Sequence, residues 1–435
     1  MKSAIIESGI NGDINIPGDK SISHRSIIIP SISQGVSEIS NILKSDDVIN
    51  TMNAFKSMGV NIKENGNKII IIGKGLGSLK KPKKEIYLGN SGTSARLLIG
   101  LLSSQKFNSI LTGDESLSSR PMTRISNLLR IMGANIEETN KSLPVFIKGN
   151  ELNKAEINVK IPSAQIKSGL ILASLNTEGT TKIIEENITR NHTEIMLESF
   201  GANIEVTKKN NLNIISVVGK KELTSKNISV PSDLSSASFF IIAALINNNS
   251  KILLKNININ PTRVGILIAL EKMNANINKK NKMYLNNELI ADIEVLSSKL
   301  NGCDLSAEMA KLMIDEYPIL SVAAAFANSK SIFRGLGELR VKESDRLELI
   351  RKNLVNCGVN TRIEGDDLII HPSKKYIVKD PKIITNFDHR IAMSFIIMGT
   401  KIGPLEIGQA DCINTSFPTF ISEFSKSGGN IFWKK

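Results

Sequence analysis

One short pattern recurs six times along this chain, and it limits the folds that the chain can adopt. Each copy passes from a helical pattern through Gly or Asn into a stretch of strand type, as in Ser57-Met58-Gly59-Val60-Asn61-Ile62. Gly or Asn at this place is typical of the residue that follows a helix, where the backbone turns left-handed. The six positions recur every 68 to 84 residues and are Gly59, Gly133, Gly201, Asn274, Gly358 and Gly428.

The copies predict the same set of elements. An amphipathic helix such as Arg124–Ile131 precedes the Gly or Asn, with apolar residues at helical spacing. A short strand and a polar turn follow, and in the first five copies a second strand such as Lys68–Ile72. Repeats of this length that combine helix and hairpin predict an α/β fold of six similar units.

At 435 residues the chain is too long for one ordinary core, so we expect two domains of three repeats each. The chain is expected to cross between them at Gly18-Asp19 and to return at Val230–Asp233. Residues 1–18 and 233–435 would then form one domain, and residues 19–232 the other.

Composition excludes several classes of protein. The longest apolar run, Phe239–Ile246, has eight residues and is too short to span a membrane. The first twenty residues hold no hydrophobic signal-peptide core. The three cysteines lie far apart, which argues against a disulfide framework and against a zinc site. We therefore expect a cytoplasmic protein without a metal.

The net charge of +13 is compatible with nucleic acid, an anionic membrane or anionic substrates. Aromatic residues make up only 4% of the chain, and no nucleic-acid-binding signature is present. Many lysines fall in polar stretches such as Lys279–Lys282, which are typical of solvated turns. Charge alone does not choose among these partners.

The segment Pro17–Arg25 places cations where a helix should begin. Asp19 or Ser21 can cap that helix, so Lys20, His24 and Arg25 would lie in or near its first turn. The helix dipole disfavours cations there, unless an anion is held between them and the free N–H groups. A solvated basic turn is the alternative.

Similar segments precede other apolar helical stretches and contain two further histidines, His192 and His389. These segments are 90–96, 118–123, 163–167, 189–194, 340–346 and 388–390. Taken singly, each fits an ordinary cap beside an exposed cation, the caps being Thr93, Ser163, Ser344 or Asp388, with Pro121 at a first helical position. Taken together, they indicate a cluster of phosphate and carboxylate sites.

Two acids complete this set. Asp315 stands just before the apolar stretch Ile319–Ala327, and Glu343 lies between Lys342 and Arg346. A plain helix cap and a surface ion pair are their ordinary interpretations. If both face one cavity, they can act as general base and general acid. The residues thus favour a metal-free transferase or lyase that acts on multiply anionic small molecules by proton transfer.

These motifs resemble the EPSP synthase family of enolpyruvyl transferases. The matching segments are Pro17–Arg25, Gly89–Thr93, Gly113–Met122, Pro162–Gln165, Asp315-Glu316, Leu339–Leu347 and Asp388–Arg390. The resemblance implies an inside-out α/β barrel of six βαβαββ units in two domains, with the active site in the interdomain cleft. It also implies transfer of the enolpyruvyl group of phosphoenolpyruvate to the 5-hydroxyl of shikimate 3-phosphate, by a monomer without cofactor, nucleic acid or membrane partner.

The resemblance assigns roles to individual residues. Asp315 would be the base, Glu343 the acid, and Lys20 would contact both substrates. The residues expected to bind shikimate 3-phosphate are Lys20, Ser21, Arg25, Ser163, Ala164, Gln165, Thr189, Arg190, Asp315 and Lys342. Those expected to bind phosphoenolpyruvate are Lys20, Gly92, Arg120, Gln165, Arg346 and Arg390.

The chain departs from one branch of that family at Ala164, Thr189, Asn191, Glu338 and Thr415, which indicates the other branch. The sister enzyme that acts on UDP-N-acetylglucosamine usually carries a reactive cysteine in the loop matching residues 113–121. That loop has no cysteine here, which argues against the sister activity. A basic nucleic-acid-binding protein is the remaining alternative, and its affinity would fall steeply with salt.

Overall fold

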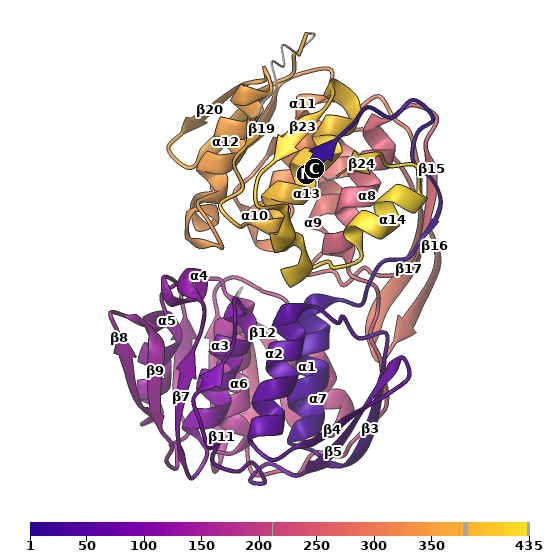
Figure 1. Ribbon diagram of the computed structural model, residues 1–435. Helices are drawn as coiled ribbons and strands as arrows, with labels where there is room; N and C mark the ends of the chain where they lie inside the picture. Colours follow the sequence, from indigo (N-terminus) through magenta and orange to yellow (C-terminus); the bar gives the residue numbers. More distant parts are fainter. Residues whose placement is uncertain (211, 374, 377–381, 433–435) are drawn as a thin grey trace. The chain divides into compact units, whose positions relative to one another are not determined.

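The computed structural model describes residues 1–210, 212–373, 375–376 and 382–432 (Figure 1). The chain divides into two compact units. The first unit consists of Met1–Pro17, Pro231–Tyr284 and Leu289–Lys435. The second consists of Gly18–Val230 and Leu285–Glu288.

The described strands form six separate four-stranded sheets, three in each unit, and not one closed barrel. In each sheet a parallel pair is followed by two antiparallel neighbours. One example joins β6 (Ile86–Tyr87), β7 (Asn108–Thr112), β9 (Ser142–Lys148) and β8 (Asn135–Thr139) in that order. The prediction of six similar α/β units is confirmed.

The sheet of β6 to β9 belongs to the second unit, together with two others. Their strands are β14 (Ile228–Ser229), β3 (Gln34–Ser40), β5 (Lys68–Lys74) and β4 (Asn61–Asn65), and then β10 (Glu156–Val159), β11 (Thr180–Glu185), β13 (Leu212–Val218) and β12 (Asn203–Lys209). Three sheets belong to the first unit. Their strands are β16 (Asn276–Leu285), β17 (Glu288–Leu296), β15 (Lys251–Asn258) and β2 (Asn11–Ile14); β18 (Asp304–Leu305), β19 (Ser331–Phe333), β21 (Asp367–His371) and β20 (Asn360–Glu364); and β22 (Lys382–Ile383), β23 (Leu405–Ile407), β1 (Lys2–Ser3) and β24 (Ile431–Phe432).

The N-terminal strands complete repeats that lie far along the chain. Strand β1 pairs with β23 and β24, and so supplies the second hairpin strand that the sixth copy lacks in its own sequence. Strand β2 runs parallel to β15, whereas β14 runs parallel to β3. The strand just before each crossing of the chain, β2 or β14, therefore completes a sheet of the unit that the chain is about to leave.

Each repeat contributes two main helices, of which the first is buried. The buried helices are α1 (Lys20–Ser31), α3 (Gly92–Ser103), α6 (Ala164–Leu175), α8 (Leu234–Ile246), α11 (Tyr317–Ala325) and α13 (His389–Ile402). The second helices are α2 (Asp46–Ser57), α5 (Thr123–Ile131), α7 (His192–Ser199), α9 (Gly265–Lys272), α12 (Arg346–Asn356) and α14 (Phe420–Lys426). Short helices are α4 (Glu115–Ser118), α10 (Glu308–Met313), and the 3₁₀ segments η1 (Gly337–Val341) and η2 (Ala410–Thr415).

The Gly or Asn of each copy follows the second helix, as predicted. All six positions have positive φ, from +62° at Asn274 to +106° at Gly428. A residue with a Cβ is strained in that conformation unless, like Asn, it can stabilise it locally. The repeated residue therefore terminates the helix and turns the chain into the following strand.

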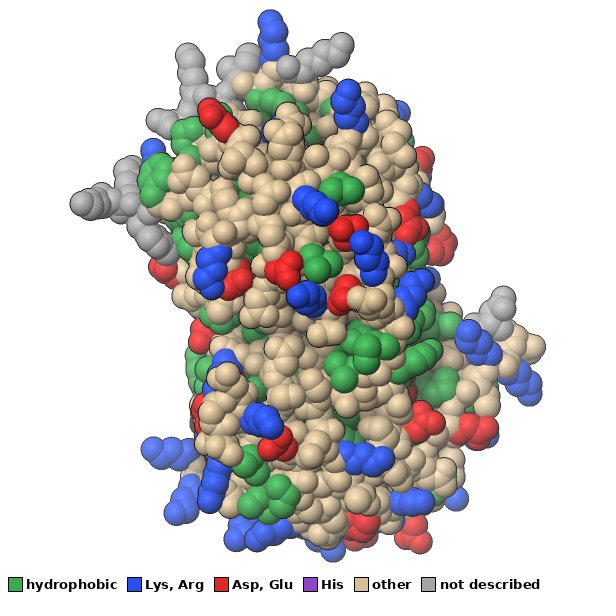
Figure 2. Space-filling model, turned by 90° about the vertical axis from the view of Figure 1, so that its right-hand side faces the viewer, with side chains coloured by type: hydrophobic (Ala, Val, Ile, Leu, Met, Phe, Trp, Pro, Cys, Tyr) green, Lys and Arg blue, Asp and Glu red, His purple; other side chains and the backbone are tan. Residues whose placement is uncertain are grey.

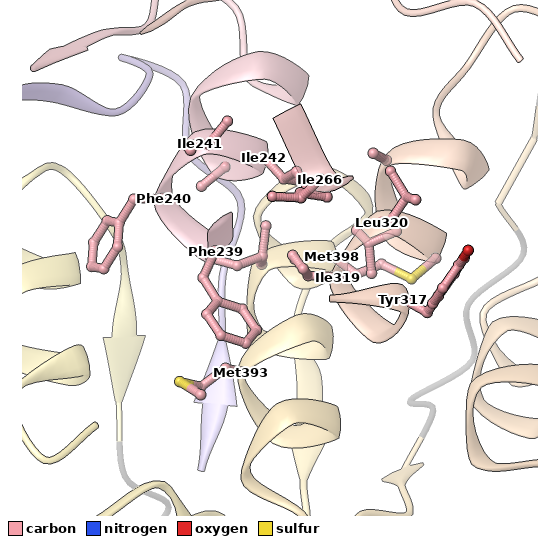
Figure 3. Packing of buried hydrophobic residues seen from close by; sticks show 14 of the residues in the cluster. Phe239, Phe240, Ile241, Ile242, Ile266, Tyr317, Ile319, Leu320, Met393 and Met398 are labelled. Atoms are coloured by element: carbon pink, nitrogen blue, oxygen red, sulfur yellow. The ribbon is translucent and has the colours of Figure 1, made fainter. Parts of the chain in front are cut away.

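The core of the first unit is built around α8, whose thirteen residues are all buried. Figure 3 shows Phe239, Ile241 and Ile242 of this helix near Ile266 of α9 and Leu320 of α11. A helix that is apolar on every side must be surrounded by other elements. Helices α11 and α13 pack on it and on each other, so these three helices form the interior of the unit.

In the second unit, helices α3 and α6 approach closely through two glycines. A Cβ placed on Gly100 would lie 2.0 Å from the carbonyl oxygen of Gly169, a distance that no side chain tolerates. Glycine is therefore required at this crossing for steric reasons.

The helix caps confirm three predictions and correct others. The carboxylate of Asp19, the hydroxyl of Ser163 and the carboxylate of Asp388 accept hydrogen bonds from first-turn N–H groups. The cap of α3 is Ser91, because its hydroxyl accepts from the N–H of Ser94, so the prediction of Thr93 is wrong.

Two further start positions differ from the prediction. Asp345 caps α12 by accepting from the N–H of Glu348, and Ser344 instead donates its hydroxyl to Asp388. Helix α5 begins at Thr123, so Pro121 stands before the helix and not at its first position. Several hydroxyl and acidic residues adjoin each start, and the tertiary contacts decide which one caps it.

The surface carries mixed charges. On the face shown in Figure 2, Lys and Arg side chains are scattered among Asp and Glu. The expectation that Lys279–Lys282 form a solvated turn is wrong, because these residues belong to strand β16, where Lys280 and Lys282 are nevertheless exposed. Among the residues that the structure describes, no helix has the length and apolarity that a membrane span requires.

Candidate active site

The predicted site segments stand at the N-terminal ends of helices in both units. Segments that carry Lys20, Gly92 and Gln165 open the buried helices of the second unit. Asp315 precedes α11 and His389 opens α13 in the first unit. The first N–H groups of a helix lack intrahelical partners, so each of these starts favours an anion.

Lys20 is the first residue of α1, and it is paired. Its ammonium forms an ion pair with Asp47, a mostly buried carboxylate at the start of α2. His24, one turn further along α1, shares a 2.8 Å hydrogen bond between its Nδ1 and Oγ1 of Thr51. Burial lowers the pKa of His24, and the charges of Lys20 and Arg25 lower it further, so this imidazole is neutral.

Arg25 points into the protein, where its three donor groups are used. Its Nε donates to Thr193 at 2.6 Å, Nη2 to Ser168 at 2.7 Å, and Nη1 to the carbonyl oxygen of Ser21 at 2.8 Å. Burial lowers the pKa of Arg25 to about 10, because nearby carboxylates, that of Glu194 foremost, offset it only in part. The residue orders Ser21 and the start of α1, and its own guanidinium is largely buried.

Gly92 begins α3 beside two guanidinium groups. A Cβ on Gly92 would lie 2.8 Å from Nη1 of Arg96 and 3.2 Å from Nη1 of Arg120. Arg120 is held by Asn90, which accepts from its Nη2 through the side-chain oxygen at 2.5 Å. Two cations at a helix start whose first residue lacks a side chain are suited to an anionic group.

Gln165 is joined to the same place. Its Oε1 accepts from Nη1 of Arg96 at 2.8 Å, and its Nε2 donates to Oγ1 of Thr93 at 3.0 Å. The structure thus brings Gly92, Arg120 and Gln165 together within the second unit. Arg96, which was not predicted as a site residue, makes the connection.

The predicted phosphate-binding segment at Thr189-Arg190 precedes α7. Thr189 is buried and donates its hydroxyl to Oε1 of Glu185 at 2.5 Å. Its carbonyl oxygen accepts from the ammonium of Lys167 at 3.3 Å. Ser163 and Ala164, at the start of α6, are half-buried.

In the first unit, three carboxylates surround Arg346. The Arg346 guanidinium is fully buried and bonds Asp388 through Nε at 2.8 Å and Nη2 at 3.4 Å. Its Nη2 lies 2.5 Å from Glu343, and its Nη1 lies 3.3 Å from Asp315. The predicted base and acid are therefore brought together on one cation. Lys342 lies 3.7 Å from the same Asp315 oxygen.

Burial opposes both charges of the Arg346–Asp388 pair, but their mutual attraction outweighs it. Burial alone would lower the pKa of Arg346, yet the carboxylates of Asp388, Glu343 and Asp315 raise it above its usual range. Burial likewise works against the Asp388 carboxylate, and Arg346 nonetheless lowers the pKa of Asp388. Both groups stay charged, so Arg346 presents a permanent cation to whatever binds beside it.

Arg390 completes this group. Its Nη1 donates to the carbonyl oxygen of Asp315 at 3.0 Å and lies 3.8 Å from Glu316. Glu316 is buried and accepts from the hydroxyl of Ser235, at the start of α8. The backbone of the predicted base is thus held by a predicted substrate-binding arginine.

Sequence analysis did not predict three acids or cations that hold the predicted residues. These are Asp47, Arg96 and Asp388, the last of which was interpreted only as a helix cap. Arg96 and Asp388 stand in motifs around helix starts, but a motif does not show which charged members pair with each other. Asp47, at the start of α2, lies in none of these motifs. The hydroxyl of Thr415 bonds locally to the carbonyl oxygen of Cys412 at 2.7 Å.

Comparison with known proteins shows the family to which the chain is similar. The family model described as EPSP synthase (3-phosphoshikimate 1-carboxyvinyltransferase) matches residues 6–424. A 3-phosphoshikimate 1-carboxyvinyltransferase of Bartonella quintana is 44% identical over 97% of this chain and 97% of its own length. The one of Ruthia magnifica is 43% identical over 98% of this chain and 97% of its own. A solved EPSP synthase structure from Acinetobacter baumannii covers 98% of both chains, with 40% identity and a TM-score of 0.86.

Proposed function

The chain belongs to the EPSP synthase (3-phosphoshikimate 1-carboxyvinyltransferase) family, and from this premise we propose how its side chains serve the reaction. The enzyme transfers the enolpyruvyl group of phosphoenolpyruvate to the 5-hydroxyl of shikimate 3-phosphate, which gives 5-enolpyruvylshikimate 3-phosphate and phosphate. The observation that supports our assignment best is the pair Asp315 and Glu343 on Arg346.

We assign the proton transfers to this pair. Asp315 takes the proton of the 5-hydroxyl as its oxygen attacks the central carbon of phosphoenolpyruvate, and Glu343 delivers a proton to the methylene carbon, which becomes a methyl group. A carbon–carbon double bond is a weak base, so the acid must be held in place. In the second step the methyl group returns a proton to Glu343 and the C–O bond to phosphate breaks, which restores the double bond in the product. The departing phosphate takes the proton that Asp315 holds.

The cations are proposed to bind the two anionic substrates. Arg346 and Arg390 in the first unit, and Arg120 with Gly92 and Gln165 in the second, would hold phosphoenolpyruvate. Lys342 in the first unit would hold shikimate 3-phosphate together with residues of the second, which are Ser21, Arg25, Ser163, Ala164, Gln165, Thr189 and Arg190. Lys20 would contact both substrates. Residues of both units would thus act on one pair of substrates.

The remaining expectations concern the surroundings of the enzyme. The proposed steps need only proton transfer and electrostatic binding, so we propose catalysis without a metal or organic cofactor. We also propose a cytoplasmic monomer whose partners are its small-molecule substrates, with no nucleic acid and no membrane.

Phosphate release tests the proposed function. The purified protein is incubated with phosphoenolpyruvate and either shikimate 3-phosphate or UDP-N-acetylglucosamine, and phosphate is measured over time. Release with shikimate 3-phosphate alone is expected. Release only with the sugar nucleotide would assign the sister activity, and no release with either acceptor would overturn both. Salt-sensitive binding of nucleic acid without phosphate release would favour the third alternative.

A further inference from the structure

Lys167 is a lysine whose side chain is entirely buried, in the second turn of α6. A buried lysine is rare unless its charge is compensated. Its Nζ lies 3.0 Å from Oε2 of Glu185 and 2.7 Å from Oε1 of Glu194, and it donates to the carbonyl oxygen of Thr189 at 3.3 Å. An ammonium has three N–H donors, so these partners can use all of them.

The partners of Lys167 surround one segment of chain. Glu185 ends β11, Thr189 lies in the following turn, and Glu194 belongs to the first turn of α7. Thr189 also donates its hydroxyl to Glu185. Lys167 therefore holds the turn of Thr189 and Arg190 through its main chain. Glu185, whose charge Lys167 compensates, holds the same turn through the Thr189 side chain.

Lys167 shares the compensation of these carboxylates with a second cation, Arg25. The carboxylate of Glu194 also interacts with Arg25, whose guanidinium bonds Ser168 and Thr193. Two cations, Lys167 and Arg25, thus face two carboxylates, Glu185 and Glu194. Without Lys167, the negative charge of the two carboxylates would be only partly compensated next to a turn proposed to bind a phosphate, and like charges repel.

We propose that Lys167 is a positioning residue for the phosphate group of shikimate 3-phosphate. It holds the Thr189-Arg190 turn in its binding geometry and neutralises the two carboxylates beneath it. This inference rests on the proposed function, since it concerns the same substrate. Lys167 is placed to act without touching the substrate, because its side chain is entirely buried and its ammonium faces Glu185, Glu194 and Thr189.

The test compares an acceptor that carries the phosphate with one that lacks it. Specificity constants, kcat/KM, are measured with shikimate 3-phosphate and with shikimate for the wild type and Lys167→Met. The variant is expected to lose about 10- to 100-fold with shikimate 3-phosphate, the range for one hydrogen bond to a charged group. It should change little with shikimate. Lys182→Met, which replaces an exposed lysine on β11, is the matched control and should behave as the wild type.

A double-mutant cycle shows whether Lys167 acts through the turn. If it does, Lys167→Met should add little to the loss caused by Arg190→Ala, because both remove the same interaction with the phosphate. Should Lys167→Met fold poorly, Lys167→Met/Glu194→Gln keeps the local charge balanced and gives the same comparison.

Three results would overturn the inference. They are an equal loss with both acceptors, an unchanged constant with shikimate 3-phosphate, and full additivity with Arg190→Ala. The first would assign Lys167 a general structural role. Failure of the proposed function would look different, because the wild type itself would then release no phosphate with shikimate 3-phosphate.

Discussion

Each unit contains a buried cation surrounded by carboxylates, but the two clusters differ in how far they are open to solvent. Around Lys167, the side chains of Glu185 and Glu194 are only 1% and 5% exposed. Around Arg346, Asp388 is fully buried, whereas Asp315 and Glu343 are 18% and 24% exposed. A closed cluster can only position its neighbours. An open one can also exchange protons with a bound molecule.

The choice of cation fits this difference. The planar guanidinium of Arg346 directs donors toward three carboxylates at once. Asp388 can therefore stay paired with it inside the protein, while the other two carboxylates face outward. The ammonium of Lys167 is a compact point charge whose partners enclose it. In the proposed mechanism, the same kind of ion pairing would support chemistry in one unit and positioning in the other.

The largest expected effect comes from neutralising an open carboxylate. Asp315→Asn keeps the shape of the side chain but removes the proposed base, so kcat should fall about 10²- to 10⁴-fold. Binding of shikimate 3-phosphate, measured by titration, should be retained. Glu185→Gln, the same kind of change in the closed cluster, should lower binding far more than kcat.

The exposed Asp304, which pairs with Arg334 on the surface, provides the control for Asp315. Asp304→Asn should leave both kcat and binding at wild-type values, because an exposed ion pair contributes little. If Asp315→Asn also retained its kcat, Asp315 would be removed from the mechanism and the distinction between open and closed clusters would fail.

The second largest effect is expected at Asp388, the fully buried partner of Arg346. Asp388→Asn leaves a buried guanidinium without its bidentate carboxylate, which should lower the free energy of unfolding by about 3 kcal/mol. The KM for phosphoenolpyruvate should rise as well, because the same carboxylate caps the helix that carries Arg390. Urea denaturation and steady-state kinetics measure the two effects. Ser344→Ala removes only one hydroxyl donor to Asp388 and should cost much less; equal losses would show that the charge of Asp388 is not what matters.

Much of the fold could be predicted because its signals are local. A Gly or Asn after each second helix marks six repeats, and all six positions indeed turn left-handed. The completion of the sixth sheet by β1 has no local signal, because it joins Lys2 and Ser3 to residues more than four hundred positions away.

The site was predictable in its members but not in its pairing. The motifs contain Arg346 and Asp388, yet these residues stand 42 positions apart, and the sequence does not show that they form one ion pair. Lys167 follows Gln165 closely and resembles any lysine in a helical turn; its meaning depends on Glu185 and Glu194, which only the tertiary structure brings to it. The roles of the individual substrate-binding residues stay predictions.

Packing beneath the closed cluster gives a smaller effect. Gly100→Ala would force α3 and α6 apart, because the new Cβ would lie 2.0 Å from the Gly169 carbonyl oxygen. The free energy of unfolding should fall by about 1–3 kcal/mol. Lys167 moves with α6, so affinity for shikimate 3-phosphate should fall too. Gly77→Ala, at a position with no atom within 4 Å of the new Cβ, should change neither quantity. An unaffected affinity in Gly100→Ala would mean that the closed cluster tolerates movement of its helix.

The smallest effect concerns His24, a buried base whose Nδ1 shares hydrogen bonds with the hydroxyls of Thr51 and Ser94. Burial lowers its pKa, so the folded protein keeps it neutral while the unfolded chain takes up a proton below pH ~6.5. Stability should thus be complete above that pH and fall below it, by at most about 1.4 kcal/mol per pH unit. Asp388, whose pKa is lowered by Arg346, should lose its contribution only below pH ~3.9. The unfolding free energies of the wild type and of His24→Gln are measured between pH 5 and 7, a range around the ordinary pKa of histidine. Their difference isolates the contribution of His24. A flat difference would show that His24 takes up its proton as readily in the folded protein as in the unfolded chain, and that a buried cation here does not need the carboxylates that surround Arg346 and Lys167.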